Sequence, residues 1–158
     1  MRTPIPSSLW ITFLLMAFLF SCKEEAPHND DTRLFKKTFI DTHNGYSEAV
    51  VVLSGDLKTV YVSGQVGEGP DLDSQMRSAL SRLKAVLGKA GASMGDVVKM
   101  NTYIVDYGPQ SLETFRGVRR ELLGDSDMPA STLVGVESLA LPEWLIEIEA
   151  VAVVPVRE

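Results

Sequence analysis

Carboxylate and hydroxyl side chains on predicted strands are the groups of this chain that could do chemistry. In the run from Leu145 to Val153, Glu147 and Glu149 alternate with apolar residues, as in a half-buried strand. A carboxylate on the less apolar face of such a strand can hold a water molecule for attack, or it can be a solvated or hydrogen-bonded interface group. Tyr46 leaves a similar choice between a pocket hydroxyl and an interface aromatic.

Motifs for metal or cofactor binding are nearly absent from the 158 residues. The two histidines, His28 and His43, are fifteen positions apart and do not form a pair of metal ligands at helical or hairpin spacing. The glycine-rich turn at 64–69 stands alone, without the preceding and following sequence context that a dinucleotide site requires. We therefore expect neither a metal nor an organic cofactor.

Length and charge restrict the class of protein further. The chain is 45% hydrophobic and carries 21 acidic and 15 basic residues, a formal net charge of −6. This length and composition fit one globular domain. Nucleic-acid binding needs several basic residues on one face, and the densest basic cluster, Arg116, Arg119 and Arg120, has acidic neighbours. We interpret the cluster as a solvated helix face and expect no nucleic-acid partner.

The first 22 residues have the layout of a bacterial lipoprotein signal. Arg2 precedes an apolar run at 10–20 that is too short to span a membrane. Cys22 follows this run in a setting that resembles a lipobox, and as the only cysteine it can form no intrachain disulfide. We expect 1–21 to be removed, Cys22 to be acylated and 22–33 to be a polar linker. The domain would then be lipid-anchored in the bacterial cell envelope, on its periplasmic or its surface face.

Hydrophobic periodicity predicts a single α+β domain over 34–158. Alternating or apolar runs predict strands, and apolar residues that recur every three and four positions predict two amphipathic helices. The predicted strands are 34–40, 47–53, 59–64, 96–105, 131–136 and 145–153, and the helices extend through 76–90 and 112–123. Asp73 and Ser111 are the expected helix N-caps. The order βββαβαββ places the two helices against one sheet.

Several segments together resemble the RidA (YjgF) family. They are Tyr61–Val66, Leu83–Leu87, Ala90–Ser93, Asp96–Lys99, Pro129–Ala130 and Ile146–Ala152, and their order and spacing match over nearly the whole domain. The resemblance implies a chorismate-mutase-like fold, one mixed sheet with two helices on one face, and a homotrimer whose sheets form a barrel. It also implies hydrolysis of reactive imines and enamines in small pockets between subunits, with release of ammonia and without a cofactor.

The resemblance assigns roles to particular residues. It implies that Tyr46, Ser63 and Gly64 line the pocket and that Glu147 positions the attacking water. Leu133 takes the place of a pocket cysteine and makes the pocket more apolar. These assignments define a substrate pocket with one catalytic carboxylate.

One position departs from the family pattern. The family's substrate-binding arginine falls at Ser131, and a hydroxyl cannot replace a bidentate guanidinium. An α-imino acid should therefore bind weakly. A pocket asparagine of the family falls near Arg116, which either reaches in to supply the missing charge or faces solvent.

Two functions remain open. In the first, the protein hydrolyses a small imine or enamine, with a substrate choice altered by the loss of the family arginine at Ser131. In the second, the trimer retains a small ligand without chemistry and is a binding or scaffold protein tethered to the envelope membrane. The fold does not decide between them, because function resides in the site and the site is what departs from the family.

Overall fold

The computed structural model describes residues 35–156. The elements are β1 (Lys36–His43), β2 (Tyr46–Ser54), β3 (Leu57–Val66), α1 (Leu72–Lys89), the 3-10 turn η1 (Met94–Asp96), β4 (Val97–Val105), α2 (Pro109–Leu123), β5 (Ala130–Val136) and β6 (Ile146–Pro155). The predicted order of strands and helices is confirmed. The predicted signal segment, Cys22 and the linker lie outside the described residues, in which no helix is long and apolar enough to cross a membrane.

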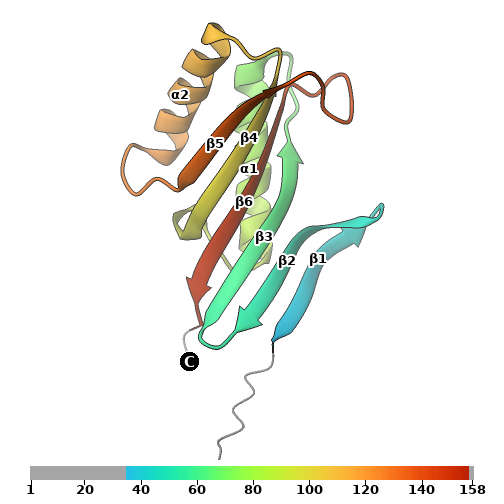
Figure 1. The fold of residues 1–158 in the computed structure, drawn as a ribbon, viewed down its shortest axis with the longest axis vertical. Coiled ribbons are helices and arrows are strands. Elements are labelled where there is room, and N and C mark those ends of the chain that lie inside the picture. The colour runs from blue at the N-terminus through green and yellow to red at the C-terminus, as the bar shows by residue number, and fades with distance from the viewer. Residues whose placement is uncertain (1–34, 157–158) are drawn as a thin grey trace, which may run out of the picture. The chain divides into compact units, whose positions relative to one another are not determined.

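The strands form one mixed sheet in the order β1-β2-β3-β6-β4-β5 (Figure 1). Neighbouring strands are antiparallel except β4 and β5, which are parallel and are connected by α2. In Figure 1, α1 lies behind β3 and β6, and α2 lies beside the β5 edge. The predicted fold class, one mixed sheet with two helices, is therefore confirmed.

The hydrophobic core lies between the helices and one face of the sheet. Met76, Leu83 and Leu87 of α1 are buried against it. Alternate residues of β6 complete this face, namely Ile146, Ile148, Ala150 and Ala152, each no more than 3% exposed. Because side chains alternate along a strand, Glu147 and Glu149 lie on the opposite, open face of the sheet.

The predicted helix caps are wrong by two or three residues. Asp71, not Asp73, caps α1, because its carboxylate accepts the Ser74 backbone N–H at 2.9 Å. Asp73 lies inside the first turn and instead pairs with Arg77, four residues on. Helix α2 begins with Pro109 after Gly108, and Ser111 lies inside its first turn.

Two irregularities in the sheet position the candidate site. Strand β2 pairs with β3 only from Ala49 to Ser54, so that its first residues, 46–48, leave the sheet with the end of β1 (Figure 1). Strand β3 has a bulge against β6 between Val62 and Gln65. The bulge displaces Ser63 and Gly64 from the regular hydrogen-bond ladder, next to the residues of β2 that leave the sheet.

Candidate functional site

A polar network surrounds the Tyr46 hydroxyl at the start of β2. His43 Nε2 lies 3.0 Å from the Tyr46 hydroxyl and 3.3 Å from a carboxylate oxygen of Glu48, and His43 Nδ1 lies 2.8 Å from the Asp41 carbonyl oxygen. The Tyr46 hydroxyl in turn donates to Glu48 over 3.5 Å. Burial, the charge of Glu48 and this hydrogen bond raise the pKa of Tyr46. The phenol therefore stays protonated at neutral pH.

The buried amide of Gln65 fixes the far side of this network. Its Nε2 donates to Glu48 Oε2 at 2.8 Å and to the Ser63 carbonyl oxygen at 3.2 Å. The Ser63 hydroxyl donates to the Ser47 carbonyl oxygen at 2.6 Å, where the β2–β3 ladder ends. The bulge and the departing end of β2 are thus joined through side chains.

A hollow of about 530 Å³ lies between this network and α1. It is lined by Asp41, His43, Tyr46, Glu48, Gly64, Gln65, Val66, Arg82, Ala85, Val86, Lys89 and Trp144. Two of the predicted pocket residues, Tyr46 and Gly64, belong to this lining. Ser63 and Tyr46 also line a shallower hollow on the outer side of β2, with Phe39 and Val50.

Glu147 lies directly against Gly64. A Cβ at residue 64 would overlap the Glu147 carboxyl group, so only a glycine permits this approach. The carboxylate is half-buried and accepts no hydrogen bond from the described residues. Burial, with a smaller contribution from Glu149, raises the pKa of Glu147. The structure thus brings together Glu147 and Gly64 and leaves the carboxylate oxygens available to a ligand or water.

Glu149, two residues along the same face, has a different environment. It accepts hydrogen bonds from Asn101 Nδ2 at 2.7 Å and from the Tyr103 hydroxyl at 3.2 Å. Burial and the charge of Glu149 raise the pKa of Tyr103, so that the phenol remains a donor. Of the two carboxylates, only Glu147 is without a protein donor in the described part of the chain.

Ser131 and Leu133 lie at the other side of the sheet, on β5. Ser131 is exposed, and its hydroxyl accepts a hydrogen bond from Arg119 Nη1 at 2.7 Å. Leu133 is partly buried against the core. Arg116 is exposed and makes no hydrogen bond or ion pair with the described residues. The arginine of α2 that the structure brings to Ser131 is therefore Arg119, so the prediction that Arg119 belongs to a solvated helix face is wrong.

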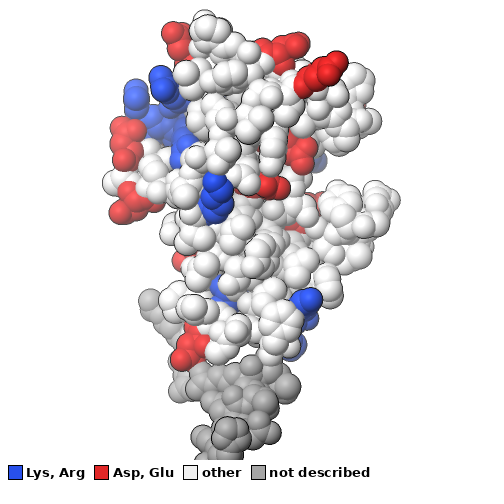
Figure 2. Space-filling model, in the orientation of Figure 1, with Lys and Arg blue, Asp and Glu red and all other residues white. Residues whose placement is uncertain are grey.

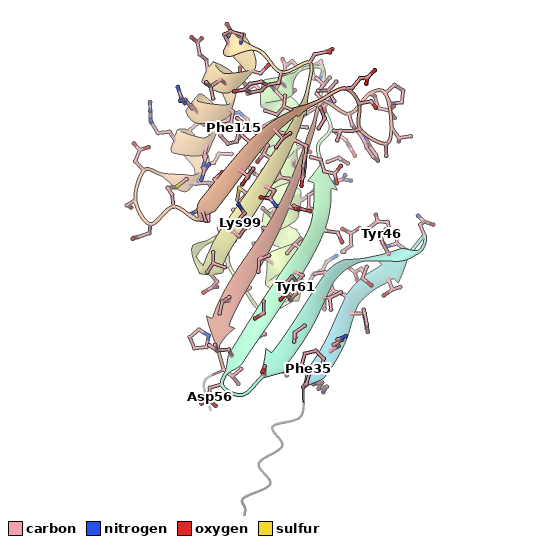
Figure 3. The ribbon with its side chains drawn as sticks, in the orientation of Figure 1. Phe35, Tyr46, Asp56, Tyr61, Lys99 and Phe115 are labelled. Carbon is pink, nitrogen blue, oxygen red and sulfur yellow. The ribbon has the colours of Figure 1, made fainter. Side chains whose placement is uncertain are left out.

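The single chain does not bring Ser131 and Glu147 together. Ser131 pairs with Met100, which is buried on the helix side, whereas Glu147 pairs with Tyr103, whose position has the opposite facing. Tyr46 lies on β2, four strand spacings or about 19 Å across the sheet from β5. Figure 3 shows Tyr46 toward the β1 edge of the sheet and Phe115 of α2 toward the β5 edge.

Residues 91–95 have the Gly-x-Ser-x-Gly pattern of a nucleophilic serine. The structure gives Ser93 a different role. Its hydroxyl donates to Asp96 Oδ2 at 2.7 Å, and Asp96 also accepts the Ser93 backbone N–H, which closes the turn η1. His43, the histidine among the described residues, is bonded to Tyr46 instead.

Within residues 35–156, no three His, Cys, Asp or Glu side chains are grouped so that they could hold a metal ion. The described site therefore consists of a carboxylate, a phenol with its polar network and a separate arginine–serine pair. The fold and this site define a chorismate-mutase-like α+β domain with polar residues at both sides of its sheet.

Comparison with known proteins specifies the family. The family model described as Endoribonuclease L-PSP matches residues 36–154, and the chain belongs to this family. A protein of Dermatophagoides farinae named 2-iminobutanoate/2-iminopropanoate deaminase is 35% identical over 118 residues, which cover 69% of this chain and 85% of the relative. The RutC family protein YjgH of Escherichia coli strain K12 is 33% identical over 122 residues, which cover 72% of this chain and 89% of the relative.

Solved structures agree with the fold. The crystal structure of a Mycobacterium tuberculosis member of the YjgF/YER057c/UK114 family has a TM-score of 0.65 at 34% identity. The match covers 75% of this chain and 100% of that chain. The resemblance to the RidA (YjgF) family that the sequence motifs carry is thereby confirmed, while the roles of individual site residues stay predictions.

Proposed function

We propose that this protein hydrolyses a small reactive imine or enamine to a carbonyl compound and ammonia, at a site shared between subunits of a homotrimer. The observation that carries the proposal is the half-buried Glu147 carboxylate, which lies against Gly64 and has no hydrogen-bond donor among the described residues. The relative named as an iminobutanoate and iminopropanoate deaminase supports the class of reaction.

Glu147 holds the attacking water in this proposal. The water oxygen adds to the imine carbon, Glu147 accepts the water proton, and Glu147 then passes this proton to the imine nitrogen. The hydroxyl proton of the resulting carbinolamine moves to the amino group as the C–N bond breaks, which releases ammonia and leaves the carbonyl product. The raised pKa of Glu147 makes its carboxylate a stronger base. The Tyr46 hydroxyl is a donor for the substrate at the rim of the hollow.

Assembly is part of the proposal, because one protomer keeps Ser131 and Glu147 on opposite faces of the sheet. The open face carries large apolar side chains that water contacts in a single chain: Phe39 is 60%, Tyr61 50% and Val134 41% exposed. Covering such a surface favours association. A trimer in which the β5 edge of one subunit meets the Tyr46 and Glu147 side of the next would complete three equivalent sites.

The first experiment compares imine hydrolysis by the purified full chain with that of two variants. Glu147→Gln should lower kcat by at least about 100-fold, because it removes the base without changing side-chain size. Glu149→Gln is the matched control on the same face of β6 and should retain most of the activity. Equal losses in the two variants, or none in Glu147→Gln, would contradict the role of Glu147.

The second experiment tests whether each site needs two subunits. Glu147→Gln and Ser131→Phe chains are each inactive as pure trimers in this proposal, because Phe at the exposed β5 position blocks the cleft. When they are unfolded, mixed in equal amounts and reassembled, about a quarter of the sites should combine two intact halves. Absence of any recovery, with trimers formed, would show that each site lies within one chain.

The alternative is a trimer that binds a small ligand without chemistry, and the observation that favours it is the uncharged Ser131 at the position of the family arginine. Substrates with and without a carboxylate discriminate between the two functions. Turnover of a carboxylate-free imine that Glu147→Gln abolishes supports the enzyme. Ligand binding without turnover of either kind of imine supports the binding protein.

The location of the protein is a separate proposal that rests on residues outside the described range. We propose that Cys22 is acylated and anchors the domain to a membrane of the bacterial envelope, since its setting resembles a lipobox. Cys22→Ala should abolish labelling by a fatty-acid analogue and release the protein into the soluble fraction. Membrane retention of that variant would contradict the anchor.

A further inference from the structure

The guanidinium of Arg119 occupies a partly enclosed position between α2 and β5. Its Nη1 donates to Ser131 Oγ at 2.7 Å, and its carbon lies 5.6 Å from the centre of the Phe115 ring. Its Nε is buried and has no hydrogen-bond partner. The side chain is thus held at two points while part of its donor capacity is unused.

Unlike Arg77 and Arg120, Arg119 has no carboxylate partner among the described residues. Arg77 pairs with Asp73 and Glu121, each at 2.7 Å, and Arg120 lies 3.4 Å from Asp125. A buried charge without a partner is unfavourable, and burial accordingly lowers the pKa of Arg119. An anion beside the guanidinium would compensate this charge and could accept from its accessible N–H groups.

The surroundings leave room for a small anion. A hollow of about 330 Å³ is lined by Phe115, Arg116, Arg119, Arg120, Gly124, Asp125 and Met128. In Figure 2, Lys and Arg side chains gather over the part of the surface where Figure 1 places α2, with acidic side chains beside them. The Ser131 hydroxyl accepts from Arg119, so its own proton remains available to a ligand.

We infer that Arg119 and Ser131 together bind the carboxylate of a small organic acid. Arg119 supplies the charge and a planar pair of N–H donors, and Ser131 supplies one O–H donor. The inference deepens the proposed function. It rests on that function only where it identifies the bound acid as a substrate or product of the reaction. The protein would then accept α-imino acids although Ser131 is uncharged, and the arginine that recognises them comes from α2.

The test measures binding of pyruvate, which has a carboxylate but no imine to hydrolyse, to the full chain by calorimetry. Arg119→Gln should weaken binding at least about thirtyfold, as expected for loss of the partner of a desolvated charge. Arg77→Gln removes the same charge from an arginine of α1 that lies outside this hollow and pairs with Asp73 and Glu121, and should change binding less than about threefold at physiological salt. Methyl pyruvate, which lacks the charge, should bind weakly to every variant.

Other results would overturn the inference. They are equal weakening by Arg119→Gln and Arg77→Gln, greater weakening by Arg116→Gln than by Arg119→Gln, or pyruvate binding no tighter than that of methyl pyruvate. Arg119→Lys covers the case in which Arg119→Gln does not fold. It keeps the charge but lacks the planar donors, and should weaken pyruvate binding about tenfold with unchanged thermal unfolding.

Binding and turnover separate this inference from the proposed function. If pyruvate binds through Arg119 and no imine is hydrolysed, the carboxylate site stands and the hydrolase proposal fails. If imines are hydrolysed and pyruvate does not bind through Arg119, the hydrolase proposal stands and the carboxylate site fails.

Discussion

The Gly64→Ala substitution tests whether contact with the backbone of β3 holds Glu147 in place. The added Cβ would overlap the carboxyl group and lie 2.7 Å from the Glu147 Cγ. Because Cγ itself is involved, Glu147 must change χ1, which moves its carboxylate by more than about 1 Å. A flexible, half-buried side chain makes this change at a cost of about 1 kcal/mol in stability, whereas such a displacement lowers a reaction rate about 100-fold.

The assay is a double-mutant cycle with Glu147→Ala, followed by urea unfolding and by imine hydrolysis. Gly64→Ala should destabilise the otherwise unchanged chain by about 1 kcal/mol and the Glu147→Ala chain by close to zero, since the overlapping atoms are gone. Gly88→Ala in α1, where an added Cβ meets nothing within 4 Å, is the control and should stabilise by about 0.5–1 kcal/mol. Equal destabilisation of both chains by Gly64→Ala would refute the proposed contact.

Three further predictions concern buried polar groups. Because the pKa of Glu147 is raised in the folded state, the folded chain retains a proton that the unfolded chain has lost between the ordinary glutamate pKa and the raised one. The free energy of unfolding should therefore fall as pH rises through this interval. Glu147→Gln should remove this fall in unfolding measurements. Gln65→Leu removes the amide donor of Glu48 and should destabilise by about 1–3 kcal/mol in urea; an unchanged midpoint would contradict the network. The Thr102 hydroxyl is fully buried and has no hydrogen-bond partner among the described residues, so Thr102→Val should stabilise the fold by about 1 kcal/mol and raise the melting temperature. A lower melting temperature of this variant would contradict the absence of a partner.

Most of the fold follows from local periodicity. The alternation of β6 predicted which of its residues face the helices, because burial on one face of a strand has a period of two. Prediction was less accurate where a bulge interrupts that period. An uninterrupted period of two would place Val98 on the same face as Met100, but the register between β4 and β6 shifts between Val97 and Lys99, and Val98 is 48% exposed.

The site was predictable only in part, because its contacts depend on strand register and helix packing. Residues carried by motifs, such as Gly64 and Glu147, do meet, since the motifs lie on the paired strands β3 and β6. The contact of Gln65 with Glu48 required the departure of β2 from the sheet, which no local pattern indicates. The signal that could have found Glu48 is its position two residues after Tyr46, at the same end of the strand.

The position of Arg119 changes what the serine at 131 means for substrate choice. The sequence alone links an uncharged residue at this position to loss of carboxylate recognition. In the folded chain, the Ser131 hydroxyl instead accepts a hydrogen bond from a guanidinium that has no carboxylate partner among the described residues. An arginine introduced at 131 would bring a second cation against Arg119, and the two like charges would oppose each other within the same site. In the inferred site, a small side chain at 131 is therefore a requirement for an arginine that is supplied from α2.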